Sequence, residues 1–94
     1  MNITQLRDEI RDIDFKILGL IKKRLELAKK IGLYKKEHNY PIRDLKVEEV
    51  VIKRAKDHSV HLGIPPELAI KVMGLLIDYS VKIQRQHWSN DLKE

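Results

Sequence analysis

Arg24 stands where the surrounding pattern calls for a leucine or an isoleucine. Apolar residues recur every three or four positions from Ile3 to Tyr34, and Arg24 falls on the same stripe. Such a stripe is the side of a helix that faces a partner. A guanidinium there loses hydration and needs an anion nearby, either an acid of the protein or a bound molecule. A polar residue that only fixes helix register is the alternative, and on Arg24 alone it is the favoured one.

Three more polar residues share this inward position. Lys35 lies eleven residues after Arg24, within about 20° of the same helix face and about 16 Å along the axis. Ser80 and Gln84 are one turn apart in a later stripe that is otherwise apolar. Each has a simpler explanation, since serine can bond its own helix and lysine can extend to solvent. Together, with no acid in the same stripes, the four residues predict an anion site.

A long first helix is expected to carry two of these residues. Its stripe predicts helix over residues 3–38, continuing through Gly32 because Tyr34 and His38 keep the spacing. Proline disfavours helix at the residue before it, so residues 39–41 are expected to break the chain.

Two further helices complete a single domain over residues 1–94, all-α and without a strand pattern. Asp44 is a suitable N-cap for a second helix of about fifteen residues. The prolines at 65–66 open a third helix, because proline suits the first helical turn. Residues 89–94 are expected to form a frayed polar tail.

The length of the first helix predicts a homodimer. A helix of about 36 residues spans roughly 54 Å, which exceeds the diameter of so small a globule. Two shorter helices cannot cover its apolar stripe, whereas a second copy of the chain can. The alternative is a compact monomeric bundle in which the first helix breaks at Gly32.

Composition narrows the function classes. A net charge of +5 favours anionic partners, but five aromatic residues provide little surface for stacking nucleic-acid bases. The absence of cysteine and of a long apolar run predicts a cytoplasmic chain with no membrane partner. His58 and His61 could touch a metal, but no carboxylate completes a set, so no metal is expected.

The ordered residues resemble the all-helical class of chorismate mutases over nearly the whole chain. The matching elements are Leu-Arg-Asp-Glu-Ile at 6–10, Ile-Asp at 13–14, Arg-Leu-Glu-Leu-Ala at 24–28, Ile-Gly-x-x-Lys at 31–35, Pro-Ile-Arg-Asp at 41–44, Glu48, and Ser-x-x-x-Gln at 80–84. The resemblance implies an intertwined homodimer of three-helix chains. It implies conversion of chorismate to prephenate in the shikimate pathway of aromatic amino acid biosynthesis, without a cofactor.

Roles for individual residues follow from the resemblance. It implies that Arg24 holds one substrate carboxylate, that Arg7 of the opposite subunit holds the other, and that Ser80 helps to seat a carboxylate. Geometry agrees with the exchange between subunits, because Arg7 and Arg24 lie about 25 Å apart along one helix.

The resemblance also assigns the reacting end of the substrate. Lys35 and Gln84 would approach the ether oxygen, so that Arg24, Lys35 and Gln84 form the catalytic set. Glu48 would accept a hydrogen bond from the ring hydroxyl, with the main chain at Asp44 beside it. One departure is clear, because Val47 stands where many relatives have an arginine.

The rearrangement breaks a C–O bond as a C–C bond forms, and it requires no nucleophile or metal. The protein would confine a flexible dianion and place donors at the ether oxygen. Because an amide does not titrate, Gln84 predicts a broad activity plateau with rising pH. Two alternatives stay open from the sequence: an isochorismate pyruvate lyase on the same fold, and a non-enzymatic basic helical dimer that binds nucleic acid or protein.

Overall fold

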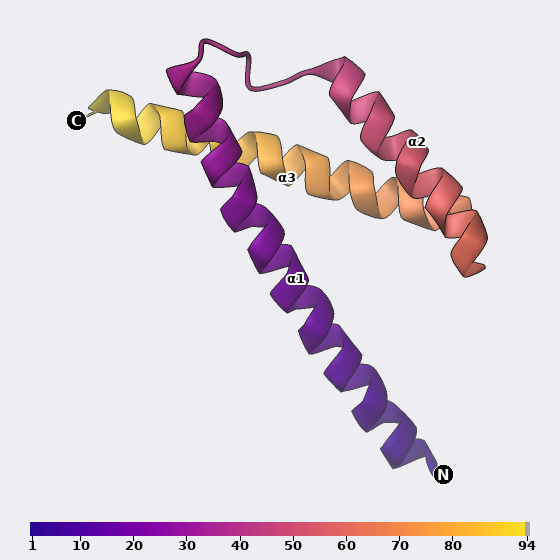
Figure 1. Cartoon of the computed structure of the whole chain (residues 1–94). Helices are drawn as coiled ribbons and strands as arrows, with labels where there is room; N and C mark the ends of the chain where they lie inside the picture. Colours follow the sequence, from indigo (N-terminus) through magenta and orange to yellow (C-terminus); the bar gives the residue numbers. More distant parts are fainter. Residues whose placement is uncertain (94) are drawn as a thin grey trace.

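The computed structural model describes the backbone of residues 1–93 and the side chains of residues 1–88. Three helices account for nearly all of this part of the chain: α1 (Ile3–Glu37), α2 (Leu45–Leu62) and α3 (Pro66–Lys93). Figure 1 shows them in order, with no strand among the described residues. The predicted all-α, three-helix fold is confirmed. The side chains of the expected tail, 89–94, lie outside the described residues, so that expectation stays a prediction.

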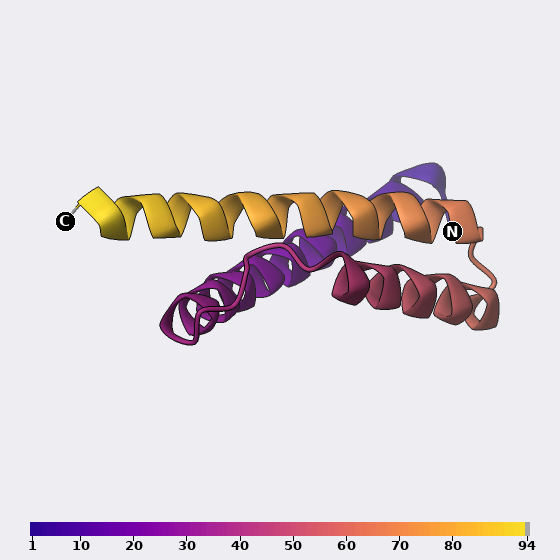
Figure 2. The ribbon, with the colours of Figure 1, turned by 90° about the horizontal axis from the view of Figure 1, so that it is seen from above.

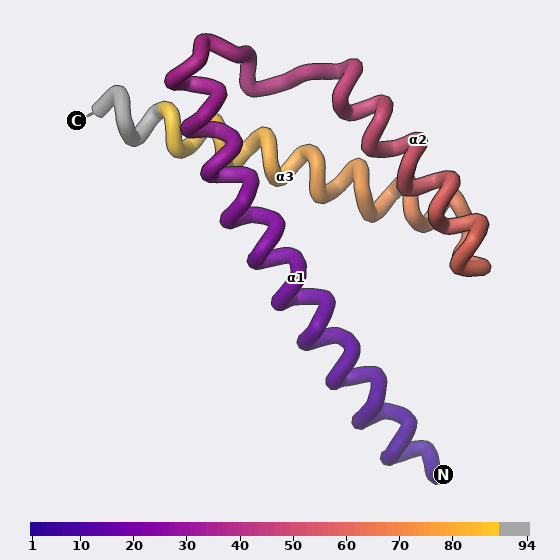
Figure 3. The backbone as a smooth tube through the Cα atoms, in the orientation of Figure 1, coloured from indigo at the N-terminus to yellow at the C-terminus, as the bar shows by residue number. Residues whose placement is uncertain are grey.

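Helix α1 begins at a capping box, in which the side chains of Asn2 and Gln5 each accept the other's backbone N–H. It continues through Gly32 to Glu37, and the N–H of the capping residue His38 bonds to the Tyr34 carbonyl. Figure 3 shows α1 as one uninterrupted helix. The prediction of a continuous first helix is correct, and the broken first helix of the alternative is wrong.

Helix α2 begins and ends where its terminal residues require. The Asp44 carboxylate accepts hydrogen bonds from the backbone of Lys46 and Val47, as the sequence predicted for an N-cap. Gly63 ends the helix with a φ of 71°, a left-handed conformation that glycine adopts at low cost. At 18 residues, α2 is slightly longer than expected. Helix α3 then starts at the second proline of the predicted pair.

Helix α3 is the common support of the chain. Both α1 and α2 pack on α3, and within the described residues they do not pack on each other. Figures 1 and 2 show α1 crossing α3 at a steep angle while α2 runs beside α3. The small core lies where α1 crosses α3, and there Ala28 of α1 is buried together with Ile77 and Val81 of α3. This crossing brings the second half of α1 to the polar stripe of α3.

The first half of α1 projects away from the rest of the chain, as Figure 1 shows. Residues 1–20 are all exposed, and the molecule is 55 Å long in its greatest dimension. The apolar stripe therefore has no cover within the chain over this segment. Its exposed members are Ile3, Leu6, Ile10, Ile13, Ile17 and Leu20.

Candidate functional site

A pocket of about 500 Å³ lies where the second half of α1, the 38–44 loop, the start of α2 and the middle of α3 meet. All the site residues predicted from the sequence line this pocket, with the exception of Arg7. The predicted residues that line it are Arg24, Lys35, Asp44, Glu48, Ser80 and Gln84. The remaining lining is largely apolar, so the charged groups stand in surroundings that strengthen electrostatic interactions.

Arg24 enters the pocket from α1 and is tied to α3 by one end of its guanidinium. Its Nη1 donates to Ser80 Oγ at 2.6 Å and to the Leu76 carbonyl at 3.3 Å. Ser80 Oγ itself donates to the Leu76 carbonyl at 2.8 Å, so the serine bonds its own helix and also receives the arginine. Among the described residues, no carboxylate lies within ion-pair distance of Arg24. A half-buried guanidinium is thus oriented without being neutralised.

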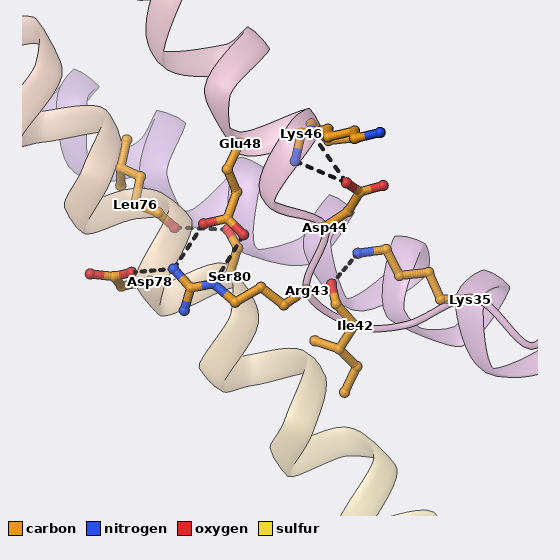
Figure 4. Close-up of polar contacts among 10 residues, drawn as sticks. Lys35, Ile42, Arg43, Asp44, Lys46, Glu48, Leu76, Asp78 and Ser80 are labelled. Carbon is orange, nitrogen blue, oxygen red and sulfur yellow. Dashed lines mark hydrogen bonds and ion pairs between the residues drawn. The ribbon is translucent and has the colours of Figure 1, made fainter.

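Lys35 lines another part of the pocket, where it contacts the 38–44 loop and α3. Its Nζ donates to the Ile42 carbonyl, a contact drawn in Figure 4, and to Gln84 Oε1 at 3.3 Å. Burial lowers the pKa of Lys35, because desolvation disfavours the ammonium, and the charges of Asp44 and Glu48 oppose this shift. The ammonium is therefore partly desolvated, with two carboxylates near enough to act on its charge.

Gln84 is only 5% exposed, and the direction of its amide is fixed. Because its Oε1 accepts from Lys35, its Nε2 is the end that can donate to a molecule in the pocket. The α1–α3 crossing here depends on Gly32, where an added Cβ would stand 2.8 Å from Gln84 Cγ. Trp88 Nε1 also donates to the Gly32 carbonyl at 2.9 Å, a second contact between α3 and α1 near this crossing.

Glu48 and Asp44 supply the acids of the pocket. The Asp44 side chain is engaged in capping α2, whereas Glu48 presents a carboxylate at the pocket wall. Arg43 binds both Glu48 oxygens, with Nε to Oε2 at 3.0 Å and Nη2 to Oε1 at 2.8 Å. No role for Arg43 follows from the sequence pattern, because a loop residue has no periodic position that would predict its partner.

Three aromatic rings stack on the loop side of the pocket, another feature missing from the sequence-based site. The ring centroids of Tyr34 and His38 are 3.9 Å apart, and the Tyr40 ring lies 6.2 Å from Tyr34. Both tyrosines line the pocket. The i,i+4 spacing of Tyr34 and His38 was the available signal for the first contact.

Arg7 and Val47 complete the set of predicted positions. Arg7 is exposed on the projecting half of α1 and does not line the pocket of its own chain. Val47 lines the pocket as an apolar wall at the position where the resemblance led us to expect an arginine. The pocket of one chain therefore contains two cations, Arg24 and Lys35, and two acids, Asp44 and Glu48.

A sequence model of the family described as "Chorismate mutase type II" matches residues 6–85. The chain belongs to the chorismate mutase type II family. The resemblance drawn from the sequence is thus confirmed, and with it the assignment to an isomerase family.

None of the helices described over residues 1–93 combines the length and apolarity needed to cross a bilayer.

The chain is also similar to individual curated proteins and to a solved structure. The chain is 29% identical to a chorismate mutase of Methanocaldococcus jannaschii, over 90% of this chain and 86% of that protein. It is 34% identical to the T-protein of Enterobacter agglomerans over 76% of this chain, but it spans only 19% of that longer protein. Among solved structures, a conserved hypothetical protein from Pyrococcus furiosus superposes with a TM-score of 0.70 at 38% identity, covering 87% of this chain and 93% of that one.

Proposed function

We propose that this chain rearranges chorismate to prephenate in the pocket between α1, α2 and α3. The observation that carries the proposal is the convergence of Arg24, Lys35 and Gln84 on one pocket, with the guanidinium of Arg24 unpaired by any described acid. A doubly charged dicarboxylate matches these donors in charge. Nothing in the proposed reaction calls for a nucleophile, since the bond changes take place within one substrate molecule.

Arg24 would bind a substrate carboxylate. Its Nη1 is occupied by Ser80 and the Leu76 carbonyl, so the guanidinium is held in place while its other N–H groups stay available. A planar fork fixed in this way fits a carboxylate with two parallel hydrogen bonds. The substrate, which is flexible in solution, would thereby be held in its folded, reactive conformer.

Lys35 and Gln84 would act on the ether oxygen. Negative charge grows on this oxygen as the C–O bond breaks, so donors placed there stabilise the transition state more than the bound substrate. Because Gln84 Oε1 accepts from Lys35 Nζ, the Gln84 Nε2 would be the end that donates to the ether oxygen. Removing one such donor typically costs about 3–4 kcal/mol of transition-state stabilisation.

The active unit would be a homodimer with shared sites. The uncovered stripe on the first half of α1 needs a partner, and burying each large aliphatic side chain contributes about 1.5–3 kcal/mol. A second α1 laid along this stripe would carry Arg7 of the partner subunit toward the pocket. That arginine would hold the second carboxylate and would add positive charge to a pocket whose own charges balance.

Product analysis tests the reaction itself. Incubation with chorismate should yield prephenate, detected as phenylpyruvate after acid treatment, whereas incubation with isochorismate should not release pyruvate. Appearance of pyruvate and salicylate instead would identify the lyase alternative.

Subunit mixing tests the shared site. Arg7→Ala and Arg24→Ala chains should each be inactive as homodimers, and a mixture should regain activity because one site of the heterodimer contains both arginines. Failure to recover activity after demonstrated subunit exchange would contradict sharing between subunits.

A further inference from the structure

The Glu48 carboxylate is bound by Arg43, and Arg43 is in turn bound by Asp78, so that a row of three linked side chains leads away from the pocket. Arg43, in the loop before α2, binds both Glu48 oxygens, and its Nη2 also lies 3.4 Å from Asp78 Oδ1 on α3. Figure 4 shows the Arg43 guanidinium between the two acids. The loop, α2 and α3 are therefore joined through one guanidinium.

Arg43 stands behind the pocket wall rather than in it. Glu48 lines the pocket and its side chain is 18% exposed, whereas neither Arg43 nor Asp78 lines the pocket. The bidentate geometry fixes the plane of the carboxylate, which a single contact would leave free to turn. The contacts to Glu48 also raise the pKa of Arg43, so its charge is secure at any physiological pH.

Without Arg43, Glu48 would be free to pair with Lys35, a cation that lines the same pocket. The two charges already attract each other across the pocket, since Glu48 opposes the lowering of the Lys35 pKa. A carboxylate released from Arg43 would be drawn toward the partly desolvated ammonium. Lys35 would then be neutralised by the protein and withdrawn from the ether oxygen of the substrate.

The net charge of the pocket lining shows why competition between Glu48 and the substrate for Lys35 would weaken substrate binding. The two cations and two acids lining the pocket cancel, although the proposed guest is a dianion. Val47 contributes no charge from α2. Pairing Glu48 with a cation outside the pocket leaves the two inner cations for the guest.

We propose that Arg43 is a positioning residue that holds Glu48 at the pocket wall and so keeps Lys35 available to the substrate, an inference that rests on the proposed function. Asp78 anchors Arg43 from α3 and assists in this role. Arg43 itself touches neither the substrate nor the reacting atoms.

The test is a double-mutant cycle on chorismate turnover in the full chain. Arg43→Ala should lower kcat/KM by about tenfold or more, with a loss in kcat because Lys35 acts at the ether oxygen. In a Glu48→Gln background, no carboxylate is free to capture Lys35, so adding Arg43→Ala should change kcat/KM by less than about twofold. Arg43→Lys, which keeps the charge but loses the fork, should fall between wild type and Arg43→Ala.

Lys53→Ala is the matched control. It breaks the exposed Lys53–Asp57 pair, at 2.8 Å, on α2, the helix that carries Glu48, and should leave activity unchanged. Asp78→Asn removes the anchor without touching the loop, and it provides a second variant with an expected smaller loss. If the wild type is active and both Arg43→Ala and Asp78→Asn are equally active, the proposal for Arg43 is overturned, whereas the proposed function is not affected.

Equal losses from Arg43→Ala in both backgrounds would also overturn it, since they would show that Arg43 only supports the loop. A wild type without turnover would overturn the proposed function, and this proposal with it.

Discussion

Gln84 packs directly against Gly32, and an added Cβ at Gly32 would lie 2.8 Å from Gln84 Cγ and 3.2 Å from Gln84 Cβ. Real Cβ atoms essentially never approach another atom as closely as 2.8 Å, so any larger residue at this position must displace Gln84 or separate the helices. The glycine therefore determines how deeply α3 sits against α1, and with it the position of the Gln84 amide.

Gly32→Ala should lower kcat by about tenfold or more, because a displacement of about 1 Å at a catalytic group can reduce the rate by up to about a hundredfold. The overpacked crossing should also cost about 1–3 kcal/mol of folding free energy. Steady-state kinetics and thermal denaturation measure the two effects. Gly19→Ala is the control, since nothing lies within 4 Å of its Cβ, and activity should be unchanged. Full activity in Gly32→Ala would contradict the proposed role of Gln84.

The pH dependence of activity should reflect Lys35 and not Gln84. Burial lowers the pKa of Lys35, so the free enzyme should lose its ammonium, and kcat/KM should fall, at a lower pH than an exposed lysine would predict. A bound dianion favours the charged ammonium, so the plateau in kcat should extend to higher pH. Both profiles should be flat from mildly acidic to neutral pH. A steep fall within that range would contradict this assignment.

A charge in the exposed stripe of α1 should dissociate the active unit. Ile13→Glu places a carboxylate where we expect another copy of α1 to pack, so the chain should become monomeric and lose most of its activity. Analytical ultracentrifugation and the chorismate assay measure the two outcomes. Thr4→Glu adds the same charge about 180° around the helix and should change neither. An active Ile13→Glu monomer would contradict the shared site.

The helices and the inward side chains were predictable because helical periodicity fixes which residues share a face. Arg24 and Lys35 therefore point to one side of α1, and Ser80 and Gln84 to one side of α3. Periodicity also favoured continuation through Gly32 over a break. These inferences depend on residues within one helix, at most about three turns apart, whose spacing can be read from the sequence.

Contacts between segments were not predictable in the same way. The need for glycine at position 32 depends on which residue of α3 crosses there, and the spacing within α1 does not contain that information. The Arg43–Glu48 pair depends on the path of a loop that has no repeating geometry. The acids that face Lys35 also come from this loop and the start of α2, so the stripes alone understated the negative charge near the site.

The most direct test of the central claim is the rate of chorismate disappearance, followed by absorbance, for wild type and for Arg24→Ala. The wild-type chain should accelerate the rearrangement far above its spontaneous rate. Arg24→Ala should retain the fold, shown by an unchanged helical signal, and lose about a hundredfold or more in kcat/KM, since hydrogen bonds to charged groups contribute up to about 3 kcal/mol. A wild-type chain that leaves chorismate at its spontaneous rate, or an Arg24→Ala chain as active as wild type, would contradict the account.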